Sequence, residues 1–145
     1  MQFTPIQFNS PEYISALALR NKVLRLPLGL TLNEADTLGE DKQLHFAILN
    51  NTQLIACIIA KEVSPNTLKL RQMAVDENFR GLGVGRFLMR QIEQYALNKN
   101  FQHITLNARI SAVEFYRKLG YIRDGELFIE VTIEHVTMCK LLKQS

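Results

Sequence analysis

Three glycines stand at alternate positions near the middle of the 145-residue chain, in the segment Arg80-Gly81-Leu82-Gly83-Val84-Gly85. Glycine lets the backbone turn sharply and lets N–H groups approach a ligand without a Cβ atom in the way. A helix that begins here adds unsatisfied N–H groups and about half a positive charge. Together with Arg80 and Arg86, the pattern favours a phosphate or pyrophosphate site. A strand-to-helix connection that needs glycine only for tight packing explains the loop as well, so the loop alone leaves both interpretations open.

Two familiar phosphate loops do not fit this spacing. A Walker A loop continues with Lys and Ser or Thr after its last glycine, whereas Gly85 is followed by Arg86 and Phe87. A dinucleotide-binding loop has the pattern Gly-x-Gly-x-x-Gly in the first strand-helix unit, with an acidic residue about 20 positions later. Here the pattern is Gly-x-Gly-x-Gly and strands precede it. Both classes of phosphate loop are therefore disfavoured.

Local signals predict the elements that lead to the loop. Ser10 before Pro11 is a typical helix start, and Asn50-Asn51 between two β-rich runs indicates a hairpin. The expected elements are a strand over 2–8, a helix over 13–24, an irregular stretch over 25–41 with a short helix over 32–37, and strands over 43–49, 53–61 and 68–75.

The second half begins with a helix, because apolar residues from Val84 to Ala96 recur at helical spacing. A strand is expected over 102–107. A capping box at Ser111 to Glu114 predicts a helix that ends at Leu119, with Gly120 as a left-handed C-cap. The apolar pattern of the tail, 121–142, changes phase, which predicts a bulge or tight turn near Glu134-His135.

The resulting order, β-α-β-β-β-α-β-α-β-β, predicts an α+β fold around a mixed central sheet. Composition agrees with a globular protein, with 47% hydrophobic and 21% charged residues. The length suits one domain, drawn over residues 1–145. We also expect no signal peptide and no membrane span, because the longest apolar run, Leu54 to Ala60, is too short. Two cysteines, Cys57 and Cys139, are expected to be reduced packing residues of a cytoplasmic protein.

Two motifs resemble the Gcn5-related N-acetyltransferase (GNAT) superfamily. Arg80-x-x-Gly83-x-Gly85, after a strand that ends at Val75, is similar to the acetyl-CoA loop of that family. About 30 residues later, Ala112-Val113-Glu114-Phe115-Tyr116-Arg117-Lys118-Leu119-Gly120-Tyr121 resembles its A-x-x-F-Y-x-x-L-G-Y/F signature. The resemblance covers residues 68–142 and implies helices on both faces of a sheet whose two central parallel strands splay apart. It also implies an acetyl-CoA-dependent N-acetyltransferase.

The resemblance also implies which residues bind acetyl-CoA. The backbone of the strand end would pair with the pantetheine amides, and the loop amides would hold the pyrophosphate. Many relatives have Asn seven residues before the signature tyrosine, whereas this chain has Arg109 there and Asn107 two positions earlier. The predicted donor-binding residues are Met73, Ala74, Val75, Arg80, Gly81, Leu82, Gly83, Val84, Gly85, Arg86, Asn107 and Arg109.

Tyr116 matches the tyrosine that, in many members, donates a proton as the thiolate leaves. A phenol with an ordinary pKa of about 10 is protonated at pH 7 and can protonate a thiolate whose thiol has a pKa near 8.5. Tyr116 lies one step from the apolar stripe Ala112, Phe115 and Leu119, so a core role stays possible on spacing alone.

A protonated amine acceptor needs a base, because only a few amines in 10⁴ are neutral at pH 7. Many relatives carry a carboxylate on the strand before the loop, but Leu68-Lys69-Leu70-Arg71-Gln72-Met73 has none. Glu130 and His135 flank the phase change in the tail and are the candidate bases, although both also suit ordinary surface positions. His45 is expected to pack. No spacing among His, Cys, Asp and Glu resembles a metal site.

The predicted acceptor is a primary amine of a small molecule or peptide, attacked directly in a ternary complex. The leucine-rich stretch 24–38, with Glu34 and Asp36, would suit a cation with an apolar body. Net charge is −1 over residues 1–66 and +4 over 67–145, too weak a bias to indicate nucleic acid. A monomer or homodimer is expected. The alternative function is a non-catalytic acyl-CoA-binding or sensing module on the same fold.

Overall fold

The computed structural model describes residues 1–143 and divides the chain into two compact units. The first unit comprises residues 1–61 and 72–92, and the second comprises residues 62–71 and those from 93 onward. The single domain predicted from the sequence extends over 1–145, of which 144 and 145 lie outside the described residues. Whether the whole chain acts as one domain stays a prediction.

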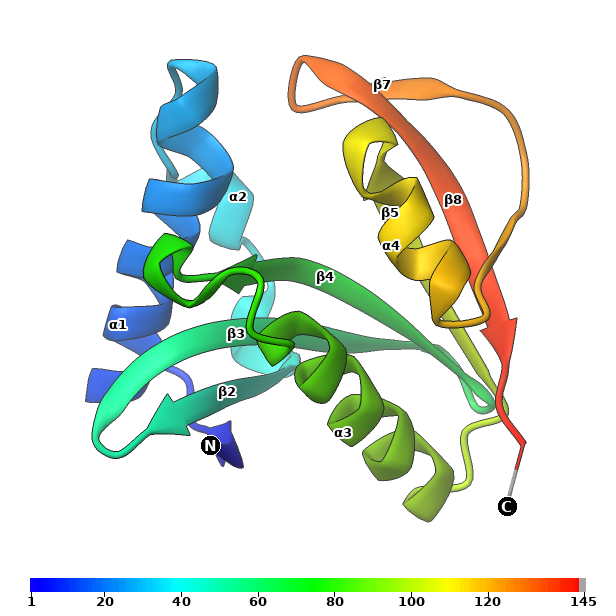
Figure 1. Cartoon of the computed structure of the whole chain (residues 1–145), viewed down its shortest axis with the longest axis horizontal. Helices are drawn as coiled ribbons and strands as arrows, with labels where there is room; N and C mark the ends of the chain where they lie inside the picture. Colours follow the sequence, from blue (N-terminus) through cyan, green and yellow to red (C-terminus); the bar gives the residue numbers. More distant parts are fainter. Residues whose placement is uncertain (144–145) are drawn as a thin grey trace. The chain divides into compact units, whose positions relative to one another are not determined.

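The first unit is built on strands in the order β1-β2-β3-β4, of which β1, β2 and β3 pair antiparallel (Figure 1). Its strands are β1 (Gln2–Ile6), β2 (Leu44–Asn50), β3 (Gln53–Ser64) and the end of β4 (Thr67–Val75). Its helical segments are α1 (Pro11–Arg20), a π-helical turn (Asn21–Arg25), α2 (Glu34–Thr37), and 3-10 turns at Leu26–Leu28, Glu40–Lys42 and Glu77–Phe79. The predicted elements of this half are therefore confirmed.

Two local signals act as the sequence predicts. The Ser10 hydroxyl accepts a hydrogen bond from the Tyr13 N–H at 3.2 Å, and Pro11 occupies the first turn of α1. Asn51 takes a left-handed φ of 58° between β2 and β3. Asparagine tolerates this conformation better than other residues with a Cβ atom, so the hairpin forms where it was expected.

Helix α1 packs on the strands of the first unit through small side chains. Ala16 and Leu19 form a buried cluster with Cys57 of β3 and Ala74 of β4. Burial raises the pKa of the Cys57 thiol to about 12, because the thiolate is disfavoured away from water. Cys57 is free and acts as a packing residue, as expected.

The second unit has strands in the order β4-β5-β8-β6, with β7 also paired to β8 (Figure 1). The pair β4–β5 is parallel, and the pairs made by β8 are antiparallel. Its elements are the end of α3 (Val84–Asn98), β5 (His103–Arg109), a 3-10 turn (Ile110–Ala112), α4 (Val113–Lys118), β6 (Ile122–Arg123), β7 (Phe128–Glu130) and β8 (Ile133–Leu141). The predicted α+β class with a mixed sheet is confirmed.

The tail differs from the prediction. The turn lies at Val131 and Thr132, with φ of 50° and 66°, rather than near Glu134-His135, and the tail holds three strands instead of two. The pattern was misleading because β8 carries buried residues on both of its faces, such as His135 and Val136. When both faces of a strand are buried, apolar residues occur on either face, so a change in the apolar pattern does not mark a turn.

Helix α4 begins and ends near the predicted positions, but the predicted capping box at Ser111 does not form. Ala112 is the N-cap and makes no side-chain cap, because a 3-10 turn over Ile110–Ala112 precedes the helix. At the other end, the Tyr121 N–H donates to Tyr116 O and the Gly120 N–H donates to Arg117 O, with Gly120 at a φ of 96°. This is a Schellman cap. Within residues 1–143, no helix has the length and apolar character needed to cross a membrane.

Candidate active site

The glycine loop joins β4 to α3 in the first unit. Gly81 and Gly83 have φ of 76° and 80°, and a Cβ atom at either position would meet no atom within 4 Å. Glycine is therefore required here by the left-handed backbone and not by crowding, since other residues lose about 1–2 kcal/mol in this conformation. The space beside both glycines is open to a ligand.

The loop leads directly into the N-terminus of α3. The Phe87 N–H donates to Gly83 O at 3.0 Å, at the start of α3. The first N–H groups of α3, which begins at Val84, have no carbonyl partner within the helix itself. Arg80, Leu82 and Arg86 are exposed. The N-terminal N–H groups of α3, the positive end of its dipole and two guanidinium groups make this segment suited to a phosphate or diphosphate.

Strand β4 is irregular just before this loop. Gln72 has a φ of 57°, which is unusual for a residue with a long side chain inside a strand. Pairing of β4 with β5 covers Thr67 to Leu70 and ends there. Residues 73–75 follow the irregularity, and Ala74 is buried while Met73 and Val75 are partly exposed.

Tyr116 of α4, in the second unit, combines a buried ring with an accessible hydroxyl. The residue as a whole is 9% exposed, and its ring contacts Phe115 and Tyr121 edge-on, with centroids 5.0 and 5.9 Å away. Burial raises the pKa of Tyr116 to about 12. The Tyr116 hydroxyl has no hydrogen-bond partner among the described residues. Every side-chain oxygen of these residues that is shielded from solvent does have a partner, so the Tyr116 hydroxyl must be in contact with solvent. By contrast, the Tyr121 hydroxyl donates to Glu93 Oε2 at 2.7 Å.

Asn107 and Glu130, predicted for different roles, are hydrogen-bonded to each other in the second unit. Asn107 Nδ2 donates to Glu130 Oε2 at 3.2 Å, and the Thr137 hydroxyl donates to Asn107 Oδ1 at 3.0 Å. Thr137 was missed, because only the register of β5 on β8, which pairs Asn107 with Thr137, reveals it. Glu130 is exposed.

His135 lies on β8, opposite Arg109 of β5. The residue is 5% exposed, and its ring stacks on Phe128, with centroids 5.9 Å apart. Nδ1 lies 2.9 Å from Ile133 O. A carbonyl oxygen only accepts, so Nδ1 carries the hydrogen and Nε2 of the neutral ring keeps its lone pair. This is the tautomer that a base with a free Nε2 requires.

Other polar groups of the first unit have structural roles. His45 is buried, with Nε2 2.7 Å from Glu40 O, which agrees with the expected packing role. Asp36 accepts from the Asn33 N–H at 2.9 Å and lies 3.4 Å from Arg25. The Asp36 carboxylate is thus held locally, and its suggested role in binding a cationic acceptor stays a prediction.

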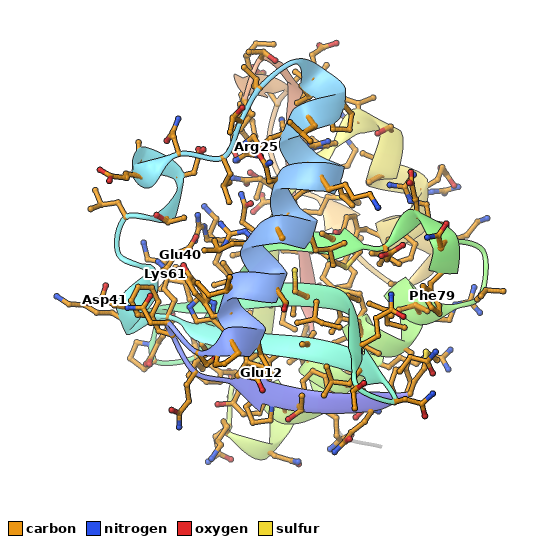
Figure 2. The ribbon with its side chains drawn as sticks, turned by 90° about the vertical axis from the view of Figure 1, so that its left-hand side faces the viewer. Glu12, Arg25, Glu40, Asp41, Lys61 and Phe79 are labelled. Carbon is orange, nitrogen blue, oxygen red and sulfur yellow. The ribbon has the colours of Figure 1, made fainter. Side chains whose placement is uncertain are left out.

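A buried ion pair in the first unit had no signal in the sequence. Arg20 and Glu40 are 1% and 0% exposed, and both guanidinium NH groups meet the carboxylate at 2.7 Å. Figure 2 looks onto α1, which carries Arg20, with Glu40 labelled beside the helix and Arg25 toward the end away from Glu12. Among the described residues, no group of three or more His, Cys, Asp or Glu side chains is arranged to hold a metal ion.

A family profile described as an acetyltransferase (GNAT) domain matches residues 32–142, which include the glycine loop and Tyr116. The chain belongs to the GNAT acetyltransferase family. As a GNAT member it is an acetyl-CoA-dependent acyltransferase, which confirms the family and the enzyme class expected from the two motifs.

One relative is similar to this GNAT acetyltransferase in sequence, and two solved structures share its fold. Protein YyaT of Bacillus subtilis (strain 168) is 29% identical over 113 residues, which cover 78% of this chain and 75% of YyaT. An acyl-CoA N-acyltransferase from Pseudomonas aeruginosa has a similar structure, with a TM-score of 0.82, 21% identity and coverage of 96% and 98%. A GNAT family acetyltransferase from Elizabethkingia anophelis with acetyl-CoA bound has a TM-score of 0.77, 17% identity and coverage of 97% of each chain.

Proposed function

We propose that residues 1–145 act as one N-acetyltransferase domain that moves an acetyl group from acetyl-CoA to a primary amine of a small molecule or peptide. Transfer occurs by direct attack within a ternary complex. The observation that carries this proposal is the open, left-handed glycine loop at the N-terminus of α3, where Gly81 and Gly83 leave space beside the main chain for a diphosphate.

The same segment supplies most of the proposed donor site. The backbone of residues 73–75 pairs with the amide groups of the donor's extended arm. The open space at Gly81 and Gly83 fits a diphosphate close to the main chain. Arg80 and Arg86 add positive charge. Asn107 and Arg109 complete the proposed set, and the Asn107 amide has a second hydrogen that is not used by Glu130.

Two side chains of the second unit are proposed to move protons. In its neutral form, His135 takes a proton from the ammonium form of the acceptor at Nε2, because the hydrogen bond to Ile133 O holds the ring hydrogen at Nδ1. The neutral amine nitrogen then forms a bond to the acyl carbon while the carbon–sulfur bond breaks, and Tyr116 donates its hydroxyl hydrogen to the departing sulfur. The bonded nitrogen releases its second proton, which returns to the Tyr116 oxygen through solvent, and His135 releases its proton to solvent, so that the amide and the free thiol are formed and both side chains are restored. Glu130 is the less favoured base, since it is exposed and accepts a hydrogen bond from Asn107.

Incubation of the protein with acetyl-CoA and a pool of primary amines, followed by measurement of free thiol, tests the proposal. Amine-dependent thiol release with acetylated product is expected. Binding of acetyl-CoA without thiol release for any amine would instead favour the non-catalytic acyl-CoA-binding module. Absence of any heat in calorimetry with acetyl-CoA at millimolar concentration would contradict the proposed donor site itself.

A further inference from the structure

The buried cluster around Arg20 reaches the irregular residue of β4. Arg20 Nε donates to Gln72 Oε1 at 3.2 Å, while its two NH groups bind Glu40. Tyr13 donates its hydroxyl hydrogen to Glu40 Oε1 at 2.8 Å. Every member of this chain of contacts lies in the first unit.

The ion pair gives Arg20 a fixed direction. A buried ion pair adds little net stability over apolar side chains of similar volume, so its distinctive property is orientation. The fork of the guanidinium group binds Glu40 at two atoms, which leaves Nε as the donor directed toward Gln72. Because a guanidinium group only donates, the Gln72 amide must present its oxygen to it.

Gln72 needs such support. A left-handed backbone costs a residue with a Cβ atom about 1–2 kcal/mol, and glutamine lacks the short side chain with which asparagine compensates locally. The neighbouring Ala74 is held from the same helix, through its buried contacts with Ala16 and Leu19. Helix α1 therefore holds both the irregular residue and the segment that follows it.

We propose that Arg20, acting through Gln72, is a positioning residue for the thioester donor. By keeping Gln72 left-handed, it sets the direction of the backbone over residues 73–75, whose N–H and C=O groups bind the donor's amide-containing arm. The inference rests on the proposed function only for the statement that residues 73–75 contact the donor.

Calorimetric titration with acetyl-CoA tests this role in four variants. Gln72→Met removes the acceptor of the Arg20 hydrogen bond and is expected to raise the Kd for acetyl-CoA about tenfold, the effect of losing a hydrogen bond to a charged group. Gln72→Gly adopts the left-handed backbone freely but lacks the hydrogen bond, so it preserves the fold and is expected to raise the Kd at least threefold. Gln72→Glu restores an acceptor oxygen and should bind within about twofold of wild type.

Tyr13→Phe is the matched control. It removes a hydrogen bond of the same buried cluster without touching Gln72, so it should lower the unfolding midpoint while leaving the Kd within about twofold. Wild-type affinity in both Gln72→Met and Gln72→Gly, or equal weakening in Tyr13→Phe, would overturn the proposal. If the wild-type protein binds acetyl-CoA but acetylates no amine, the proposed function fails while this comparison of Kd values remains decisive.

Discussion

Replacement of Tyr116 by Phe separates the two properties of this side chain, because it keeps the ring and removes only the hydroxyl. The ring contacts with Phe115 and Tyr121 do not involve the hydroxyl, and that hydroxyl has no hydrogen-bond partner in the described residues. Stability at pH 7 and the Kd for acetyl-CoA should therefore stay close to wild type. Turnover should fall, because the departing sulfur loses its proton donor.

The size of the fall follows from the environment of the phenol. Proton donation by a positioned side chain contributes about 10²- to 10⁴-fold to a rate. Burial raises the pKa of Tyr116 to about 12, so it is a weaker acid than a free phenol and the lower end of that range applies. We expect turnover to decrease about 10²-fold, equivalent to about 2.7 kcal/mol in the barrier.

Stopped-flow measurement of thiol release under single-turnover conditions, with saturating acetyl-CoA and amine, reports this chemical step. Tyr95→Phe, on α3, is a tyrosine control outside the proposed site and should leave the rate unchanged. Undiminished turnover in Tyr116→Phe would refute the proposed role. A fall in turnover with an equal loss of acetyl-CoA affinity would also refute it, because it would indicate damage to donor binding.

Four further predictions concern stability and the remaining site residues. The pKa of Tyr116 is higher in the folded than in the unfolded chain, so its contribution to the free energy of unfolding is present below pH 10 and is lost as the pH rises through about 12. Denaturant titrations at several pH values should therefore show that the free energy of unfolding falls by about 2–3 kcal/mol more in wild type than in Tyr116→Phe over this range. Glu40→Gln should lower the free energy of unfolding by about 3–5 kcal/mol in urea titration, because Arg20 stays charged and buried without its partner; a loss under about 1 kcal/mol would contradict this. Gly83→Ala should cost about 1–2 kcal/mol of stability through backbone strain alone and weaken acetyl-CoA binding in calorimetry, and an unchanged Kd would argue against the loop as the diphosphate site. His135→Gln should reduce thiol release about 10²-fold with an unchanged Kd for acetyl-CoA, and full activity would exclude His135 as the base.

Errors in the sequence prediction concentrate in the tail. A two-residue turn between strands is usually recognised by Asn or Gly, which adopt positive φ easily. Here Val131 and Thr132 form the turn, and β-branched residues give no such signal. The predicted capping box at Ser111 does not form, because the 3-10 turn Ile110–Ala112 occupies the residues that the motif assigns to the helix start.

The sequence by itself determined the family and, outside the tail, the order of the elements. Ser10 with Pro11, Asn51 and Gly120 act through hydrogen bonds or φ angles within a few residues, so their effects can be read from neighbouring positions. The glycine loop and the Tyr116 motif are likewise contiguous.

Tertiary structure alone decided which polar groups meet. Arg20 binds Glu40 and Gln72 across 20 and 52 residues, and Asn107 meets Glu130 across 23. Such contacts depend on helix packing and on strand register, in which a shift of one residue moves every side chain to the other face. No local pattern fixes that register, because it results from burying the apolar faces of the whole sheet together.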